Sequence, residues 1–401
     1  MLLFLSMKFA HLADCHVGGW QEPRLRQLGI ESFRLAIDTC LQENVGLVLI
    51  AGDLFNTALP SIELVKEVAH ELSKLKEENV GVYIIPGSHD FSPSGKTMLD
   101  VLERAGLCVN VFKVKDNQLQ ITEDKTGVKI TGVLGLAAGL DKEVYKKLDF
   151  SNVENAQGFK IFMLHTTVDE FKPDEHIEGE SINSFPKSFN YYAAGHVHYL
   201  LDKKIHNGLL VYPGPVFPNN FKELEDLKHG RFCIVDDDLN LRRIDLKIKD
   251  VVSYTFDVTD KNPEEVTREI LSTIKEFYDK IVLLRLGGVL QQGKPGDIDF
   301  KSIFDALKTS YCILKNTNQV SSKEFQEFEI EEGEVVDVED KIIEEHIGQI
   351  RVEFNEKEIV KNLMNVLDDE KLEGEKGYDF EDRLEKNVVK ILHLEEIWSC
   401  S

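Results

Sequence analysis

Histidines and aspartates follow five separate apolar runs in this chain. Each run has the length of a buried strand and is bounded by Gly or polar residues. In an open α/β sheet, the loops at the carboxyl ends of the strands converge on one crevice, where such folds place their chemistry. The residues expected to meet there are Asp14, His16, Asp53, His89, Asp90, His165, His196 and His198.

The types of these residues indicate a metal centre. Imidazole and carboxylate groups without thiolates suit divalent ions of intermediate hardness, such as Mn, Zn or Fe. Four or five histidines and two aspartates exceed what one tetrahedral ion needs, so two ions are the simpler interpretation. Two ions roughly 3.5 to 4 Å apart can hold both the attacking and the leaving oxygen of a displacement at phosphorus. The sequence therefore predicts phosphoester hydrolysis.

Each short motif alone also has a structural interpretation. A single Asp at a strand end usually caps the next helix, and a single His beside an apolar run is usually a core residue. Chance does not easily produce the ordered series DxH, GDLF, GSHD, an isolated strand-end His and GHVH, with an apolar run before each. The series as a whole favours a functional site.

The series resembles the calcineurin-like metallophosphoesterases and, within them, the SbcD-type or meiotic-recombination nucleases of DNA double-strand-break repair. Three segments carry the resemblance and look archaeal, namely residues 7–16 (MKFAHLADCH), 50–55 (IAGDLF) and 192–198 (YAAGHVH). The resemblance is strong over residues 7 to about 245 and only architectural beyond them.

The resemblance implies a role for each residue of the series. His89 would protonate the leaving 3′ oxygen or steady the charged phosphate, a role that suits an imidazole because its ordinary pKa lies near working pH. Asp90 would orient the His89 ring. The implied metal ligands are Asp14, His16 and His198 at one ion, His165 and His196 at the second, and Asp53 between the two.

Two positions depart from the family pattern. The family usually has Asn before the His of the third motif, where the amide oxygen ligates the second ion, and this chain has Ser88. A hydroxyl is shorter and a poorer ligand, so we expect Ser88 to hold that ion weakly or through water. The family often has a His directly after GDLF, and this chain has Asn56. Neither change removes a charged ligand or the acid, so we expect an active site.

Length and composition are consistent with a globular enzyme. A chain of 401 residues is too long for a single core and indicates two or three units, and its 42% hydrophobic and 29% charged residues are typical of globular proteins. No apolar run approaches the roughly 20 residues that span a bilayer. Residues 1–5 are interpreted as an extension before a natural start at Met7. Six cysteines without CxxC spacing argue against disulfides and favour the cytoplasm.

The net charge of −24 is unusual for an enzyme that acts on DNA. Residues 321–401 carry a net charge of −15, and the first 320 residues carry −9. Affinity for phosphates depends on local basic residues, for which Arg24, Arg26 and Lys96 are candidates; the alternative interpretation is that all three are ordinary surface charges. We expect modest DNA affinity from this chain alone and a partner that supplies the rest.

Alternating strands and amphipathic helices, such as those expected over residues 32–42 and 62–77, predict a layered α/β fold. The resemblance implies an α-β-β-α metallophosphoesterase core, the nuclease domain, over residues 1–245. A further amphipathic helix over residues 98–105 could pack in the core, and in the family such helices build a homodimer interface.

A second unit is expected after residue 245. The pattern is strand, helix, strand, Gly-rich loop and helix, over residues 251–258, 263–278, 280–286 and 300–307. It resembles the small α+β capping domain of the family, here residues 246–315, which helps choose DNA ends. Residues 316–340 are rich in Asn, Ser, Glu and Gly and predict an acidic flexible linker.

Residues 341–401 contain two short amphipathic helical patterns. Two such helices bury little on their own, so we expect their apolar faces to dock in a groove. In the family a helical pair grips the coiled-coil base of an SbcC-type ABC ATPase. The alternative is a hairpin folded back on the chain's own core. The two faces comprise Ile359, Leu363, Val366 and Leu367, and Phe380, Leu384, Val388, Ile391 and Leu392.

Together these features predict a DNA nuclease subunit of a double-strand-break repair complex that uses two divalent ions, manganese above all. It would act as a 3′ to 5′ exonuclease on duplex ends and an endonuclease on single strands. DNA, the ATPase and a second copy of the chain are its expected partners. Two alternatives stay open: a phosphodiesterase of the same superfamily for small nucleotides, which the cap and tail disfavour, and a catalytically weak DNA tether, which His89 disfavours.

Overall fold

The computed structural model describes residues 7–92, 97–136, 141–172, 177–323, 355–367 and 377–392. The chain divides into two compact units, of which the first comprises residues 1–252 with 279–281 and the second residues 253–278 with 282–401. The division lies several residues after the predicted boundary at 245. Residues 279–281 join the first unit, where the Ile281 N–H donates to the Asp250 carbonyl at 2.9 Å.

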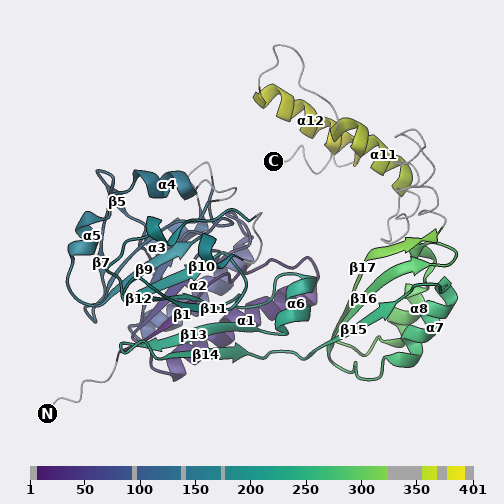
Figure 1. Cartoon of the computed structure of the whole chain (residues 1–401), viewed down its shortest axis with the longest axis horizontal. Coiled ribbons are helices and arrows are strands. Elements are labelled where there is room, and N and C mark those ends of the chain that lie inside the picture. The colour runs from purple at the N-terminus through teal and green to yellow at the C-terminus, as the bar shows by residue number, and fades with distance from the viewer. Residues whose placement is uncertain are drawn as a thin grey trace. The chain divides into compact units, whose positions relative to one another are not determined.

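Among the described residues, the first unit contains two six-stranded sheets (Figure 1). The first sheet has the order β14-β13-β1-β2-β3-β4, formed by Leu241–Leu246, Gly230–Asp236, Lys8–Leu12, Leu47–Ala51, Gly81–Ile85 and Val109–Asn110. The second has the order β11-β12-β10-β9-β8-β7, formed by Leu201–Ile205, Gly208–Tyr212, Tyr191–Gly195, Lys160–His165, Lys129–Val133 and Thr122–Glu123. Strands β1 to β4 pair in parallel, as do β8, β9, β10 and β12. A small hairpin joins β5 (Val114–Lys115) and β6 (Gln118–Leu119).

The two sheets face each other and are covered by helices. Successive residues of β1 alternate between layers: Phe9 lies in the core between the sheets, and Ala10 lies in the core under the helices. The α-β-β-α arrangement predicted from the sequence is therefore confirmed for the first unit. Its helices are α1 (Pro23–Gln42), α2 (Ile62–Glu77), α3 (Met98–Arg104), α4 (Asp141–Lys147), α5 (Ser151–Asn155) and α6 (Phe221–Leu227), with short 3-10 turns at Asp169–Phe171 and Ile182–Ser184.

Helix α1 begins at Pro23, nine residues before the helix predicted from residue 32. Proline fits the first turn of a helix because its missing N–H would have no partner there. The Glu22 carboxylate caps the start by accepting the Leu25 N–H at 2.8 Å. Residues 23–31 bury only two large apolar side chains, Leu25 and Leu28, so the sequence pattern missed this part of the helix.

Over its described residues up to 322, the second unit has a three-stranded sheet of order β15-β16-β17 and two helices. Helix α7 ends at Thr273, earlier than the predicted residue 278, because Ile274 takes an extended backbone. The predicted linker is wrong over residues 316–322, which belong to β17 and bury Thr317 and Val320. The elements are β15 (Val251–Asp257), α7 (Pro263–Thr273), β16 (Ile281–Leu290), a 3-10 turn (Pro295–Asp297), α8 (Phe300–Ala306) and β17 (Cys312–Ser322).

Helices are present at the two places predicted in the tail. Helix α11 (Glu356–Leu367) contacts α12 (Gly377–Ile391). Leu363 and Leu384 are half-buried, and Leu367 of α11 keeps 63% of its surface exposed. Residues 324–354, which include the rest of the predicted linker, lie outside the described part of the chain. Across the described helices, none combines the length and the apolar composition needed to cross a membrane.

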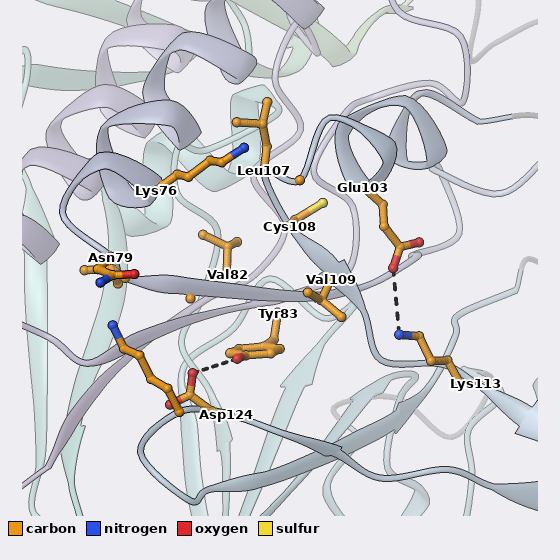
Figure 2. A pocket seen from close by; sticks show the side chains of 14 residues that line it. Lys76, Asn79, Val82, Tyr83, Glu103, Leu107, Cys108, Val109, Lys113 and Asp124 are labelled. Atoms are coloured by element: carbon orange, nitrogen blue, oxygen red, sulfur yellow. Dashed lines mark hydrogen bonds and ion pairs between the residues drawn. The ribbon is translucent and has the colours of Figure 1, made fainter.

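A cavity of about 450 Å³ opens beside the amino ends of β3 and β4 (Figure 2). On its wall the Tyr83 hydroxyl donates to the Asp124 carboxylate at 2.6 Å, and Lys113 pairs with Glu103 at 3.9 Å. Its lining shares no residue with the predicted site, because the site residues follow the carboxyl ends of the strands. The cavity is therefore separate from the predicted chemistry.

Candidate metal centre

The carboxyl ends of parallel strands from both sheets bring the predicted residues together. Residues from β1, β2, β3, β9 and β10, or from the loops directly after them, form three groups whose ligand atoms lie within 4.8 Å of one another. The groups are Asp14 with His16 and His198, His16 with Asp53 and His89, and Asp14 with Asp53 and His165. Asp14, His16 and Asp53 each belong to two groups, so the ligand atoms form one continuous cluster.

The backbone of the site is held in an uncommon conformation. Asp14, His16, Asp53 and His196 have φ values of 50°, 40°, 50° and 94°, a region that non-glycine residues seldom adopt. Hydrogen bonds between the two loops maintain it: the Asp14 N–H donates to the Gly52 carbonyl and the His16 N–H to the Asp53 carbonyl, at 3.2 and 2.9 Å. Gly52 itself has φ 83°, and a Cβ there would lie 2.1 Å from His165 Nδ1. The loops are thus shaped for the cluster.

Four imidazoles use Nδ1 to bond an oxygen acceptor. A carbonyl or carboxylate oxygen can accept only from a protonated ring nitrogen, so Nδ1 carries the hydrogen in each ring. When such a ring is neutral, the lone pair lies on Nε2, the atom that would ligate a metal. The contacts are His16 to Asn56 Oδ1 (3.2 Å), His89 to the Asn56 carbonyl (2.9 Å), His165 to the Ala51 carbonyl (2.8 Å) and His198 to Glu223 Oε1 (2.8 Å).

Several polar atoms in the cluster lack the partners that burial normally requires. Asp14 Oδ2 and His165 Nε2 are buried without a hydrogen bond, although His165 Nε2 lies 3.1 Å from Asp53 Oδ2. His16 Nε2 lies 3.1 Å from His198 Nε2. A cation between these two ring nitrogens, either a metal ion or the proton of a charged His198, would satisfy both lone pairs. The residues therefore fit divalent metal ions.

Several pKa shifts in the cluster favour the protonation states in which these side chains can bind a metal ion. Burial lowers the pKa of His16 to about 3 and that of His196 to about 4, so both rings are neutral near pH 7. Burial also works to raise the pKa of Asp53, but the charge of the nearby His165 ring holds that pKa well below the usual range. Burial raises the pKa of Asp14 to about 6. A bound cation would favour ionised Asp14 as well.

His165 differs from His16 and His196 in the direction of its pKa shift. Burial works to lower its pKa, but the nearby Asp53 charge and the contact with that carboxylate raise it to about 9. Without a metal, the ring therefore keeps its second proton at neutral pH. A divalent ion between His165 and Asp53 would replace that proton, because metal binding requires the deprotonated ring and releases the proton.

His196 lies beside His165, and His89 lies beside His16. The His196 ring stacks edge to face on the His165 ring at 5.2 Å, and its main-chain N–H donates to Asp14 Oδ1 at 2.8 Å. It is outside the three compact groups. His89 is exposed, and its ring centre lies 4.8 Å from that of His16. Its exposure gives a substrate access to this imidazole.

The prediction that Asp90 orients the His89 ring is wrong. The buried Asp90 carboxylate accepts three backbone N–H groups, from Leu54, Phe55 and Gly87, each at 3.1 Å. It therefore ties the loop after β3 to the loop after β2. The His89 ring is oriented by the Asn56 carbonyl instead. Asp90 and His89 are neighbours in sequence but not partners, because backbone N–H groups of two loops occupy the Asp90 carboxylate.

Ser88 lies at the cluster but reaches it poorly. Its hydroxyl is 3.4 Å from Asp53 Oδ2, a long contact for an O–H donor. This geometry is consistent with the predicted weak ligand.

Replacing Ser88 with Asn should tighten the second ion, because the longer amide carries an oxygen farther into the cluster. We expect the variant to need less manganese for half-maximal hydrolysis of a small phosphodiester. A Ser88→Ala variant provides the matched control, since it removes the hydroxyl without adding a ligand. Equal or higher manganese demand in Ser88→Asn would refute the assignment of Ser88 to a metal.

Sequence reasoning missed three residues that support the imidazoles. Glu223 and Asn56 accept their Nδ1–H groups, and Asn219 joins these two residues. The only signal for Glu223 was its place three residues after Asn220, a spacing that also describes an ordinary helix cap. Asn56 stands out in the sequence only as a departure from the family pattern, which indicates no role for it.

The other predicted positions have structural partners or lie outside the description. Arg26 donates from Nε to the Trp20 carbonyl at 2.8 Å, and Arg24 also has an interaction partner. Lys96 falls outside the described residues. Cys15, which lies between two proposed ligands in sequence, is buried in the core under the helices.

Comparisons with known proteins place the site in a family. Residues 7–200 match the family model of the calcineurin-like phosphoesterases. The chain is 27% identical over 324 residues to the DNA double-strand break repair protein Mre11 of Methanocaldococcus jannaschii, which covers 77% of this chain and 82% of that protein. It is 24% identical over 381 residues to the protein of the same name from Sulfolobus acidocaldarius, with 92% and 97% covered.

A solved structure, TT1561 of Thermus thermophilus, aligns with a TM-score of 0.43 and 13% identity over 60% of this chain and 99% of its own. The family model covers the stretch of chain that supplies every predicted ligand, from Asp14 to His198. Residues 7–200 thus form the calcineurin-like phosphoesterase domain of an Mre11/SbcD-like, metal-dependent phosphodiesterase.

Proposed function

We propose that this chain is the nuclease subunit of a DNA double-strand-break repair complex, and that it cuts phosphodiesters with two manganese ions. Its activities are 3′ to 5′ exonuclease cleavage of duplex ends and endonuclease cleavage of single strands. The observation that carries the proposal is the set of three overlapping groups of imidazole and carboxylate atoms, each within 4.8 Å, of which the exposed His89 belongs to one. The repair function in the names of the archaeal relatives supports the choice of DNA as substrate.

The proposed ligands divide between two ions. When bound, the ions supply Lewis acidity that activates a water molecule and offsets charge on the phosphate. Asp53 is assigned to both sites, because its Oδ2 lies 3.6 Å from His16 Nε2 and 3.1 Å from His165 Nε2, one proposed ligand of each ion. The remaining ligands are Asp14, His16 and His198 at the first ion and Ser88, His165 and His196 at the second.

His89 is proposed to act on the leaving group. Its Nδ1–H is held by the Asn56 carbonyl, so the ring presents Nε2 to a bound substrate. From that atom a protonated His89 would transfer a proton to the departing 3′ oxygen. The buried ligands His16 and His196 cannot take this part, because their lowered pKa values keep them unprotonated.

One set of assays tests the function against its two rivals. Wild-type protein is incubated with manganese and end-labelled duplex, hairpin or single-stranded DNA, beside bis-nitrophenyl phosphate. We expect cleavage of DNA, with mononucleotides released from 3′ ends. Hydrolysis of the small ester without DNA cleavage would support the small-nucleotide enzyme. Binding of DNA without hydrolysis of either substrate would support the tether.

The proposal includes a homodimer that uses α2 and α3. Exposed apolar side chains gather near the starts of these helices, where the Met98 N–H donates to the Ala58 carbonyl at 3.3 Å. Leu59, Ile62 and Val101 expose 63%, 80% and 51% of their surface. Apolar side chains exposed close together are typical of protein interfaces. We also propose a cytoplasmic location, which suits the buried free thiols of the described cysteines.

Removing residues after about 340 should separate catalysis from partner binding. The proposed capping domain and every site residue precede this point, so hydrolysis of a small phosphodiester should stay unchanged. Binding to the coiled-coil base of an SbcC-type ATPase should be lost, because α11 and α12 are removed. Calorimetry with the ATPase base and a parallel activity assay measure both effects.

A point variant of the full chain gives a finer test of the same surface. Leu367→Asp places a charge on the exposed apolar end of α11, and Asn362→Asp adds the same charge at an exposed polar position of that helix. We expect only the first variant to weaken ATPase binding. Native affinity in the truncated chain would show instead that the helical pair belongs to the protein's own fold.

A further inference from the structure

A chain of hydrogen bonds connects the loop before α6 to three imidazoles of the site. It begins at the Glu223 carboxylate, where Oε1 accepts the His198 Nδ1–H and Oε2 accepts the Asn219 main-chain N–H, both at 2.8 Å. The Glu223 N–H donates to Asn220 Oδ1 at 2.9 Å, which caps the start of α6. The start of the helix therefore fixes where the carboxylate lies.

Asn56 extends the chain of hydrogen bonds to the other two rings. The side-chain amide of Asn219 donates to Asn56 Oδ1 at 3.3 Å, and the same oxygen accepts the His16 Nδ1–H at 3.2 Å. The main-chain carbonyl of Asn56 accepts the His89 Nδ1–H at 2.9 Å. One residue thus orients a proposed metal ligand through its side chain and the proposed acid through its main chain.

The surrounding chain leaves room for this arrangement. A Cβ at Gly19 would lie 2.0 Å from Asn219 Oδ1 and 3.1 Å from Asn56 Oδ1, so the two amides occupy space that only glycine leaves open. The Trp20 indole N–H donates to the Pro218 carbonyl at 2.8 Å, directly before Asn219. The loop is held in place on both sides of the network.

A neutral imidazole has two tautomers, and only the Nδ1–H form presents an Nε2 lone pair to a metal. Partners that fix this form raise metal affinity, because the ring need not reorganise on binding. We propose that Glu223, Asn219 and Asn56 form a positioning network that sets the Nδ1–H tautomer and ring orientation of His198, His16 and His89 before a metal binds. The inference rests on the proposed two-ion function and assigns these three residues no contact with substrate.

The tautomers are measured in the metal-free protein by long-range ¹H–¹⁵N NMR of the ring nitrogens, at a pH where the rings are neutral. Asn56→Ala should mix the tautomers of His16 and leave His89 in the Nδ1–H form, because the main-chain carbonyl remains. Asn56→Asp should restore His16, since it keeps an acceptor oxygen at the same position. No general loss of structure produces this pattern.

Glu223→Ala should mix the tautomers of His198 and weaken manganese binding by roughly 10 to 100-fold in a calorimetric titration. The matched control is Asp226→Ala, which removes an exposed carboxylate from the same helix and should leave both measurements unchanged. If Glu223→Ala does not fold, the difference in His16 tautomers between Asn56→Ala and Asn56→Asp still tests the proposal.

Native tautomers at His16 and His198 in the two Ala variants, together with native manganese affinity, would overturn the proposal. This outcome is independent of any activity on DNA, because the rings are measured without metal and without substrate. Preset tautomers combined with an inability to cut DNA would count against the proposed function alone.

Discussion

Replacing His89 with Ala should lower the rate of phosphodiester cleavage by roughly 10²- to 10⁴-fold, the usual contribution of a general acid, while both metal ions stay bound. The reason is the position of the ring: it is exposed at the margin of the cluster, and its Nδ1–H is held by a main-chain carbonyl. Removal of the ring leaves the buried ligand atoms of Asp14, Asp53 and His165 in place.

The measurement pairs cleavage rates with the metal content of the purified protein, obtained by plasma emission. His70→Ala is a suitable control, because His70 is an exposed histidine on α2 away from the site residues. The structure also offers the competing interpretation, since His89 forms a compact group with His16 and Asp53. Loss of one ion in His89→Ala would make His89 a ligand, and a native rate would remove it from catalysis.

Replacing Asp53 with Asn should lower the rate of phosphodiester cleavage still further, because the Asp53 carboxylate lies close to three other residues of the site. His165 Nε2 and His16 Nε2 lie 3.1 and 3.6 Å from its Oδ2, and the His89 N–H donates to its Oδ1 at 2.8 Å. The amide keeps the size and loses the charge. We expect both ions to bind more weakly by well over the roughly 10 to 100-fold that loss of a supporting residue causes.

The same variant has a signature in the metal-free protein. The Asp53 charge is the leading cause that raises the pKa of His165 to about 9 against the effect of burial, so the pKa should fall in Asp53→Asn. NMR titration of the ring follows this change, and Asp38→Asn, at a surface carboxylate, serves as the control. Two ions bound with native affinity, or an unchanged His165 titration, would contradict the central place of Asp53.

The sequence predicted which residues come together at the site because strand ends carry strong local signals. An apolar run followed by Gly and Asp, as at residues 47–53, indicates both a buried strand and a polar side chain at its carboxyl end. Parallel strands then bring such ends together, whichever residues lie between them in sequence. The same logic predicted α2 to the residue, since its periodicity is clear and its ends are bounded.

The supporting residues could not be predicted in this way. His89 is oriented by a main-chain carbonyl, which leaves no trace in the identity of Asn56, and Glu223 is 25 residues from the ring it holds. The sequence suggested that Asp90 orients the ring of its neighbour His89. The true partners of Asp90 are backbone N–H groups of another loop, which a sequence pattern does not reveal. Strand β17 was missed for a related reason: its Asn and Ser residues resemble a linker, and only the sheet identifies Thr317 and Val320 as buried.

The cluster takes its ligands from both sheets, and the Asp14 carboxylate already joins them by accepting the His196 N–H. Ions bound there would act as cross-links between the two halves of the core. Their binding free energy would then be shared with folding: a ligand at about 100 times its dissociation constant stabilises the native state by about 2.7 kcal/mol. The concentration of metal would therefore set the stability of the folded protein as well as its catalytic rate.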